Sequence, residues 1–297
     1  MSLAPAPLGP PAWAVVVAHY DAQGRLARHL LQTVQTLQAQ GAQVHFVSTG
    51  LGDAAAAQLA PHAQVLRRPN TGYDFGSYRA GIQALGSLDG VQRLLLFNSS
   101  MVVADCARLL ALMQARAGQA DLLALTLSEE FQPHLQSFWL SFENPAILHS
   151  QAFARWWADM PNLSARGEVV AQLELGLSAH FARAGFRLAA LHQPSRDEQF
   201  RAVLRAIDSG YLPVQAGADG PVLLDPAWAR QLNPTTYAWD SVLDQLGVLK
   251  LELLQRNPHR INLARLQDRL HSQPDLAALV DDATGGPWSP SLPPPAP

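Results

Sequence analysis

The chain has 297 residues, 48% of them hydrophobic and 15% charged, which is enough to bury one large core or two smaller ones. A formal net charge of -3 gives no overall basic field, and this argues against nucleic acid as the main partner. The single Cys106 excludes an internal disulfide and a thiolate metal site, and it is typical of a reducing compartment.

Neither the first residues nor any later stretch points to a membrane. Residues 1–11 are rich in proline and have no basic segment before an apolar run, so they predict a disordered leader and no secretory signal. No later stretch reaches the roughly 18 uncharged apolar residues of a spanning helix. We therefore expect a cytoplasmic protein, for which attachment to the inner face of the membrane stays open.

The first part of the chain alternates strand and helix patterns. Apolar runs at residues 13–20, 44–49 and 64–67 have the length of strands in a covered parallel sheet. Between them, residues 26–40 and 53–59 show helical spacing. Strand, helix, strand is a βαβ unit, whose crossover is right-handed by default, so this alternation predicts an α/β fold.

A loop with two central glycines, residues 70–81, follows the third strand. Gly72 permits a positive φ or a close backbone approach, while Asn70 and Asp74 can hydrogen-bond the turn or a bound polar molecule. Loops between a strand and a helix receive nucleotides in α/β proteins. Two interpretations stay open: a ligand-binding loop, or a tight turn in which Asp74 caps the helix that runs to about residue 85.

The next strand, residues 91–97, ends abruptly in Asn98, Ser99 and Ser100. Polar residues just past the carboxyl ends of strands line the ligand crevice of an open α/β sheet. A helix at about 106–117 and a strand at 121–127 follow, and then a region rich in polar and aromatic residues. These patterns predict that Asn98 to Ser100 face a ligand.

The remaining chain divides by composition. We expect one α/β domain over residues 12–224 and a helical extension packed on it over residues 225–284. The last segment, 285–297, is rich in proline, glycine and serine, which predicts disorder.

Several stretches, taken in order, resemble one family. They are Asn70-Thr71-Gly72-Tyr73-Asp74-Phe75-Gly76-Ser77-Tyr78, Phe97-Asn98-Ser99-Ser100, His134-Leu135-Gln136-Ser137-Phe138-Trp139, Glu174-Leu175-Gly176-Leu177-Ser178, Asn233-Pro234-Thr235 with Trp239-Asp240, and Lys250-Leu251-Glu252-Leu253-Leu254 with Asn257-Pro258. Their order over about residues 13–262 resembles the rhamnan synthesis F family, glycosyltransferase-like domains of bacterial polysaccharide assembly. The resemblance implies a GT-A fold, with a Rossmann-like mostly parallel sheet flanked by helices and a helical C-terminal extension.

The resemblance also implies a site for a nucleotide diphosphate sugar. Its donor side would comprise the end of the first strand, the glycine loop and the end of the fourth strand, namely His19, Tyr20, Asp21, Asn70, Gly72, Asp74, Asn98, Ser99 and Ser100. GT-A enzymes commonly hold a divalent cation, Mg²⁺ or Mn²⁺, in a DXD motif that offsets charge on the departing diphosphate. The family more often has Asn-Asp-Ser at this place, so Ser99 stands where an acid is expected. Three explanations stay open: a metal-free enzyme, a substitute carboxylate such as Asp105, or lost activity.

Two further residues are candidates for the chemistry. Glu174 is similar to the helix-borne carboxylate of inverting GT-A enzymes, which deprotonates the acceptor hydroxyl. A solvated helix carboxylate is its other interpretation. His134 is a candidate for contact with the acceptor or the departing phosphate, and a structural histidine otherwise.

The expected function is therefore inverting transfer of rhamnose or another deoxysugar to a bacterial surface glycan or a lipid-linked glycan. Peripheral attachment to a membrane or an assembly complex stays open. The alternative is a non-catalytic GT-A-like module that binds a nucleotide sugar or a glycan. A Rossmann dehydrogenase is disfavoured because Asp21-Ala22-Gln23-Gly24 follows the first strand, where that class has Gly-x-Gly-x-x-Gly.

Overall fold

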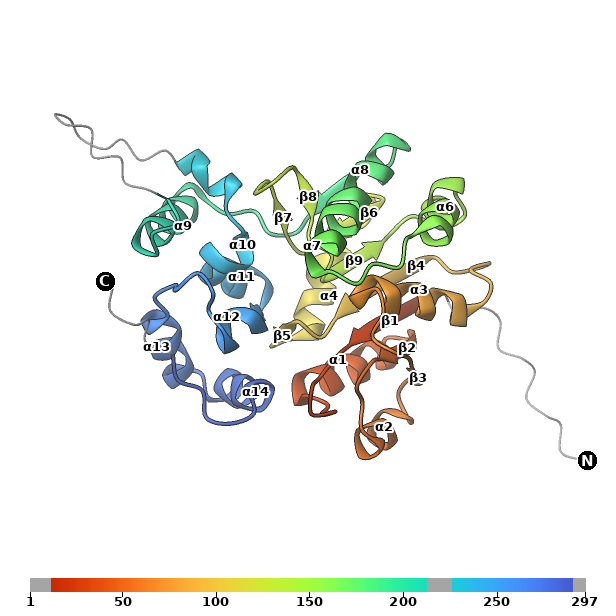
Figure 1. Ribbon diagram of the computed structural model, residues 1–297, viewed down its shortest axis with the longest axis horizontal. Coiled ribbons are helices and arrows are strands. Elements are labelled where there is room, and N and C mark those ends of the chain that lie inside the picture. Colours follow the sequence, from red (N-terminus) through yellow and green to blue (C-terminus); the bar gives the residue numbers. More distant parts are fainter. Residues whose placement is uncertain (1–11, 213–225, 291–297) are drawn as a thin grey trace, which may run out of the picture.

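The computed structural model describes residues 12–212 and 226–290, in which strands and helices alternate (Figure 1). The strands are β1 (Trp13–His19), β2 (Gln43–Ser48), β3 (Gln64–Arg67), β4 (Arg93–Asn98), β5 (Met101–Val103), β6 (Leu122–Ala124), β7 (Leu127–Ser128), β8 (His134–Leu135), β9 (Trp139–Phe142), β10 (Leu188–Ala190) and β11 (Val248–Lys250). The helices are α1 (Arg28–Ala39), α2 (Asp53–Leu59), α3 (Tyr73–Leu85), α4 (Cys106–Ala115), α5 (Pro145–Leu148), α6 (Gln151–Asp159), α7 (Arg166–Glu168), α8 (Leu175–Arg183), α9 (Arg196–Asp208), α10 (Pro234–Tyr237), α11 (Trp239–Leu246), α12 (Leu251–Gln255), α13 (Ala264–Ser272) and α14 (Pro274–Thr284). A π-helical turn, η1 (Val169–Glu174), and a 3₁₀ turn, η2 (Pro226–Gln231), complete the set.

The central sheet has seven strands in the order β10-β6-β9-β4-β1-β2-β3. Neighbouring strands are parallel except at β9, which runs antiparallel to both β4 and β6. The α/β class predicted from the sequence, a Rossmann-like, mostly parallel sheet flanked by helices, is thus confirmed. The strands at residues 13–20, 44–49, 64–67 and 91–97 are found within two residues of their predicted bounds.

Strand β1 lies inside the sheet, and its side chains alternate between two buried cores. Val15 and Val17 face one core, together with α1 and α4 residues. Ala14, Val16 and Ala18 face the other, beneath α3, α6 and α8. Because both faces are covered, the strand reads as a continuous apolar run rather than an alternating one.

The segment 70–81, predicted to be a loop, is helical from Tyr73 onward. Gly72 precedes α3 with a φ of 73°. Gly76 and Gly81 lie within the helix, where a Cβ atom would meet the Thr71 carbonyl oxygen at 2.2 Å and a Val16 methyl at 2.2 Å. These two glycines therefore allow close packing of α3. Asp74 lies in the first turn of the helix and does not cap it, so its side chain is available for other contacts.

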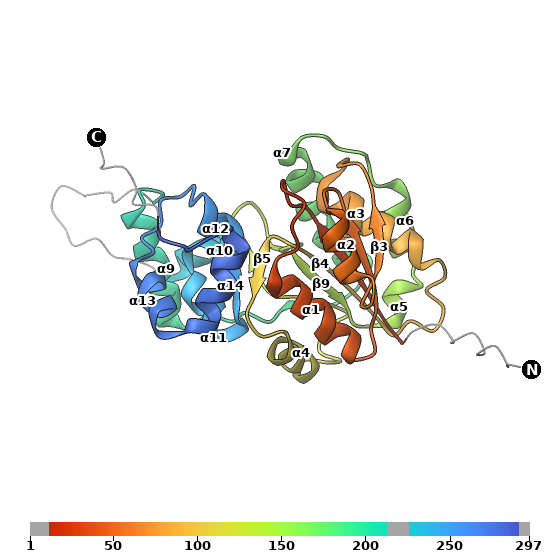
Figure 2. The ribbon, with the colours of Figure 1, turned by 90° about the horizontal axis from the view of Figure 1, so that it is seen from below.

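The C-terminal part is helical, as predicted, but it also contributes β11. This strand pairs antiparallel with β5, so that Lys250 stands opposite Met101. The helices after residue 196 share a third core that includes Val102 of β5. Figure 2 shows these helices together on one side of the molecule and the sheet on the other, with β5 between them.

Residues 285–290, which the composition predicted to be disordered, pack against the protein. Trp288 donates its indole N–H to the Leu254 carbonyl at 2.9 Å, and its backbone N–H bonds Asp281 at 2.7 Å. The predicted leader at 1–11 and the rest of the predicted tail, 291–297, lie outside the described residues, as does the junction at 213–225. In the part of the chain that is described, no helix combines the length and apolar character needed to cross a membrane.

Three buried histidines predict an acid-sensitive fold. Burial lowers the pKa of His19, His29 and His192 to about 4, against the opposing influence of Asp21, Asp282 and Glu198 respectively. Between pH 6.5 and 4 the unfolded chain binds protons at these groups that the folded chain does not, so the free energy of unfolding falls as pH is lowered. Asp74, whose pKa is raised to about 6, acts in the opposite direction but is a single group.

Urea denaturation at pH 7.5, 6.0 and 5.0 checks this expectation. Keeping a histidine neutral at a pH one unit below its unfolded pKa costs about 1.4 kcal/mol, so a clear loss of unfolding free energy is expected by pH 5. Equal stability at pH 7.5 and 5.0 would show that these histidines are not held neutral by the fold.

Candidate active site

A cavity of about 1240 Å³ opens at the carboxyl ends of β1 and β4. Its walls come from the start of α3, the π-helical turn η1, the β11–α12 junction and the chain that follows α14. Chain segments more than 200 residues apart in the sequence thus meet around one space, as Tyr20 and Trp288 do.

A chain of hydrogen bonds crosses the floor of this cavity. Asn98, at the end of β4, donates its side-chain N–H to the Asp74 carboxylate at 2.7 Å. The amide oxygen of Asn98 accepts from the Ser100 backbone N–H at 3.0 Å and from the Ser100 hydroxyl at 2.6 Å. The side chains of α3 and of the β4 end therefore form one fixed unit, which we call the strand-end network.

Lys250 extends the strand-end network from the C-terminal part of the chain. Its ammonium group donates to the Ser100 hydroxyl at 3.1 Å and lies 5.2 Å from the centre of the Phe138 ring. Leu251 fixes the backbone there, because its N–H bonds the Ser100 carbonyl at 2.9 Å. Lys250 stood in one of the family motifs and was not among the predicted site residues; the structure places it in the cavity lining.

The carboxyl group of Asp74 titrates far from its usual range. Burial raises its pKa to about 6, while the Lys250 charge and the Asn98 hydrogen bond hold the pKa down, and Glu174 raises it further. Near neutral pH this group is therefore mostly ionised but close to its titration point, as is common for carboxyl groups in functional sites.

Glu174 lines the cavity from another element of the chain. It is the last residue of the π-helical turn η1, and its carboxylate accepts the Ser137 backbone N–H at 3.0 Å. Its charge acts on Asp74, Tyr78 and Lys250. Turns of this rare type occur frequently at functional sites, because the extra residue redirects one side chain.

The structure brings most of the predicted site residues to this cavity. The residues among them that line it are His19, Tyr20, Asp21, Asn70, Asp74, Asn98, Ser99, Ser100 and Glu174. Gly72 does not line it; this residue sets the start of α3, and its backbone N–H bonds the Leu163 carbonyl at 3.1 Å. His134 also lies outside the lining; its ring bonds the Gln132 carbonyl at 2.8 Å in the β7–β8 hairpin.

The cavity also has lining residues that the sequence did not assign to the site. Ser137 and Phe138 precede β9, and their backbone and ring support Glu174 and Lys250. Arg166 of α7 forms a two-bond ion pair with Glu252 of α12, at 3.0 and 3.1 Å. The one hint of Arg166 in the sequence is a basic residue a few positions before Glu174. Its ion-pair partner, Glu252, lies 86 residues away and could not be predicted from the sequence.

The donor atoms at the strand end do not suit a divalent cation. Mg²⁺ and Mn²⁺ favour carboxylates and free oxygen ligands. Here the Asn98 amide oxygen already accepts two hydrogen bonds, the Ser99 hydroxyl bonds Tyr20 backbone atoms, and the Ser100 hydroxyl faces the Lys250 ammonium. In residues 12–212 and 226–290, no group of three histidine, cysteine, aspartate or glutamate side chains is placed to hold a metal, and Asp105 caps α4 through the Arg108 N–H.

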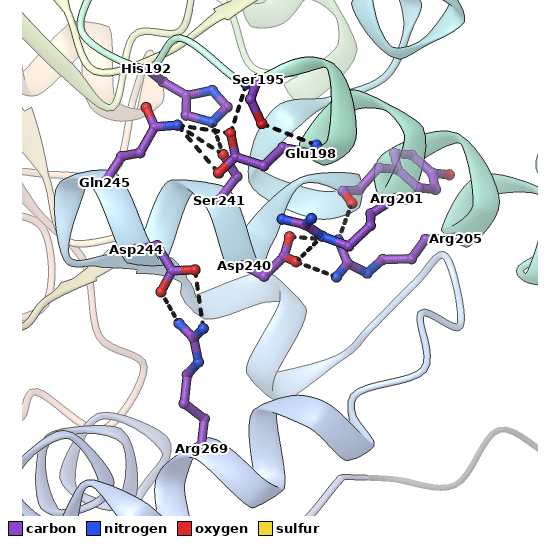
Figure 3. A network of polar contacts seen from close by, with 11 residues as sticks. His192, Ser195, Glu198, Arg201, Arg205, Asp240, Ser241, Asp244, Gln245 and Arg269 are labelled. Atoms are coloured by element: carbon purple, nitrogen blue, oxygen red, sulfur yellow. Dashed lines mark hydrogen bonds and ion pairs between the residues drawn. The ribbon is translucent and has the colours of Figure 1, made fainter. Parts of the chain in front are cut away.

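Asp240, which also stood in a family motif, belongs to a separate network (Figure 3). Its carboxylate bonds Arg205 at 2.6 Å through each oxygen and Arg201 at 3.1 Å. Burial alone would raise the pKa of Asp240, but these two arginines outweigh it and lower the pKa to about 2. The residue therefore joins α9 to α11, away from the cavity lining.

Asp240→Asn is expected to destabilise the protein by about 3 kcal/mol, because it leaves the largely buried Arg205 and the partly exposed Arg201 without their carboxylate. Urea denaturation measures the change, and Asp208→Asn on the exposed face of α9 is the matched control. Loss of ligand binding without loss of stability would place Asp240 in the site after all.

Comparison with known sequences decides the family. The sequence model described as rhamnan synthesis protein F matches residues 44–208, more than half of the chain. The chain belongs to the rhamnan synthesis protein F family. The matched region contains α3, the end of β4 and η1, which form part of the cavity wall.

Individual similarities are weaker. An uncharacterised protein of Sinorhizobium fredii, y4gN, is 28% identical over 138 residues, which are 44% of this chain and 35% of that protein. Virulence protein VirA of Vibrio anguillarum is 27% identical over 207 residues, 65% of this chain and 62% of VirA. The chain therefore spans less than two thirds of either relative. One similar solved structure is that of mannosyltransferase PcManGT of Pyrobaculum calidifontis in complex with GDP-Man and Mn²⁺. Its TM-score is 0.41 and its sequence identity is 11%; the match covers 95% of this chain and 88% of that one.

Proposed function

We propose that this member of the rhamnan synthesis protein F family is a glycosyltransferase that takes a sugar from a nucleotide diphosphate donor. The observation that carries the proposal is the meeting of the strand-end network and Glu174 across one cavity, at the carboxyl ends of β1 and β4. Ligands of open α/β sheets bind at this edge. The cavity thus offers hydrogen-bond donors, from Ser100 and Lys250, and carboxylates, from Asp74 and Glu174.

The donor would lie along β1, α3 and the end of β4. Tyr20 and Tyr73 line the cavity with 57% and 38% of their surfaces exposed, so their rings can contact a nucleobase or a sugar face. Asn70 and Asp21 stand on the same side and offer polar contacts to a base or a ribose. The diphosphate would then reach the serines at the end of β4.

Transfer requires a base for the acceptor. In the proposed step, the acceptor oxygen attacks the anomeric carbon and forms the new C–O bond. The bond from that carbon to the diphosphate oxygen breaks, and its electron pair leaves with the diphosphate. Glu174 takes the acceptor's proton. Because the acceptor attacks from the face opposite the leaving group, the configuration at the anomeric carbon is inverted. The Ser137 N–H holds the Glu174 carboxylate in one orientation for this role.

The finer assignments rest on the family. Its description as rhamnan synthesis supports rhamnose or a related deoxysugar as the transferred group, and a bacterial surface polysaccharide or its lipid-linked precursor as the acceptor. His134, outside the cavity lining, would act on the acceptor only if the bound glycan extended toward the β7–β8 hairpin.

One observation favours a second candidate, a non-catalytic module that binds a nucleotide sugar or a glycan. The motif at the strand end is Asn98, Ser99 and Ser100, so it lacks the acidic residue expected at the place of Ser99. In this alternative the cavity binds its ligand but does not release the sugar.

Incubation with a panel of UDP-, GDP-, dTDP- and CDP-sugars, followed by chromatography of the nucleotides, separates the two candidates. The enzyme is expected to release nucleoside diphosphate from one donor, faster when acceptor glycans are added. Saturable binding without any release would favour the module. The assay is run in EDTA and in Mg²⁺ or Mn²⁺, so that it also measures metal dependence.

A further inference from the structure

Lysine is nearly absent from this protein. Of its 21 basic residues, 20 are arginine and one is lysine, Lys250. That one lysine lies in the cavity, at the end of β11. Because the composition is so strongly biased toward arginine, we asked what the compact ammonium group of Lys250 does at this place that a guanidinium would not do.

The fold delivers Lys250 to the strand end by specific pairing. Strand β11 runs antiparallel to β5, with Lys250 opposite Met101, the residue that follows Ser100. The Leu251 N–H bonds the Ser100 carbonyl at 2.9 Å, and the ammonium bonds the Ser100 hydroxyl at 3.1 Å. Phe138 lies 5.2 Å beneath the charge. One hydrogen bond therefore uses one of three ammonium N–H groups, and the others are available to a ligand.

Lys250 differs from the other cations of the cavity lining in its ion pairing. Arg25 pairs with Asp21 at 3.2 Å, while Arg166 and Arg256 pair with Glu252 at 3.0 and 2.6 Å. Within the described residues, Lys250 has no carboxylate within the 4.0 Å of an ion pair. Its charge is only balanced at longer range, by Glu174, Glu252 and Asp74.

Burial lowers the pKa of Lys250, and the three carboxylates oppose that decrease, while Arg166 adds to it. A bound polyanion would replace lost solvation and favour the charged form further. The site is thus built around a positive charge that has a hydrogen-bond anchor and lacks a direct counter-ion.

We infer that the Lys250 ammonium, together with the Ser100 hydroxyl, holds the diphosphate of the donor in the place where metal-dependent transferases hold a divalent cation. The inference rests on the proposed function. It follows from the donor set at the strand end, where the oxygen atoms already face hydrogen-bond donors and the positive charge beside them is the Lys250 ammonium.

Lys250 acts on the leaving group without exchanging a proton in this account. As the bond from the anomeric carbon to the diphosphate breaks, its electron pair adds one negative charge to the diphosphate oxygen. The fixed ammonium stabilises that charge through charge-assisted hydrogen bonds. A guanidinium is larger and planar, so it would not fit between Ser100 and the Phe138 ring in the same way.

The single lysine makes a direct experiment possible. Biosynthetic labelling with ¹³C,¹⁵N-lysine keeps all three ammonium N–H groups, and because Lys250 is the single lysine it gives one resolved side-chain NMR signal. Inorganic pyrophosphate and UDP, GDP, dTDP and CDP are then titrated in EDTA. The Lys250 signal is expected to shift on binding and its pKa to rise, because the anion favours the charged form.

Variants extend the test to the unlabelled protein. Lys250→Met is expected to weaken binding of the nucleoside diphosphate in EDTA by about tenfold or more, the loss typical of a charge-assisted hydrogen bond. Lys250→Arg restores part of the affinity, and Arg265→Met, an exposed residue of α13, leaves it unchanged. Calorimetry measures all four proteins.

The outcomes separate the inference from the proposed function. If a nucleoside diphosphate binds while the Lys250 signal stays unmoved and Lys250→Met binds equally well, the inference is overturned and the proposed function stands. Binding that requires Mg²⁺ or Mn²⁺ also overturns it. If no nucleotide of the panel binds under any condition, the proposed function fails, and the inference fails with it.

Discussion

Glu174→Gln is expected to lower the rate of sugar transfer by about 10² to 10⁴ while donor affinity stays close to that of the wild type, because a glutamine cannot accept the acceptor's proton. The substitution keeps an oxygen in place of the carboxylate atom that bonds the Ser137 N–H, so the π-helical turn retains its contact. The expected pattern is therefore a fall in kcat with little change in the donor KM. Steady-state kinetics with the donor identified by the nucleotide panel measures it.

Glu168→Gln is the matched control, since Glu168 is exposed and lies only six residues before Glu174. This variant should transfer sugar at the wild-type rate. Unimpaired transfer by Glu174→Gln would remove Glu174 from the role of base. A parallel loss in donor affinity and in unfolding free energy would instead assign it a structural role.

Asn98→Leu is expected to remove nucleotide binding and to lower the free energy of unfolding by about 2–3 kcal/mol. Leucine has a similar size but leaves the Asp74 carboxylate without its N–H donor and the Ser100 N–H without an acceptor. A hydrogen bond to a charged group contributes about 1.5–3 kcal/mol, and an unsatisfied buried partner costs about as much. The loss of binding follows because Ser100 and Lys250 are no longer held in register with α3.

Ser99→Ala serves as the comparison, because its hydroxyl contacts only backbone atoms of Tyr20, at 3.2 and 3.4 Å. It should reduce stability and nucleotide binding by less than Asn98→Leu does, because it leaves the strand-end network intact. Calorimetry and urea denaturation on both variants give the result. A stable Asn98→Leu protein that binds nucleotide as tightly as the wild type would show that the strand-end network does not organise the site.

The strands of the sheet were predictable where the sequence has a continuous apolar run. Residues 13–20 and 44–49 are continuous apolar segments because both faces of the strand are covered. Strand β9 was not predicted: its four residues, Trp139–Phe142, continue a polar and aromatic region, and nothing local shows that they insert between β4 and β6 in the reverse direction. Pairing over such distances depends on the rest of the fold rather than on local pattern.

The site was predictable where motif residues follow strands, as Asn98 to Ser100 do. The loop prediction over 70–81 was wrong beyond Gly72, because the glycines that suggested a turn lie inside α3, where they make room for Val16 and the Thr71 carbonyl. Lys250 was missed as a site residue because a side chain 150 residues from Ser100 has no local signal of that contact. Lys250 is the single lysine of the chain, and this was the sequence signal that could have marked it as a site residue.

We propose that the cavity beside the strand-end network binds a nucleotide diphosphate sugar. A thermal-shift panel of UDP-, GDP-, dTDP- and CDP-sugars, in EDTA and in Mg²⁺ or Mn²⁺, tests it most directly, because a ligand that binds only the folded state adds about 2.7 kcal/mol at a hundred times its Kd. We expect one nucleotide sugar to raise the Tm in EDTA, and Asn98→Leu to abolish the increase. No increase with any donor under any of these conditions would contradict it.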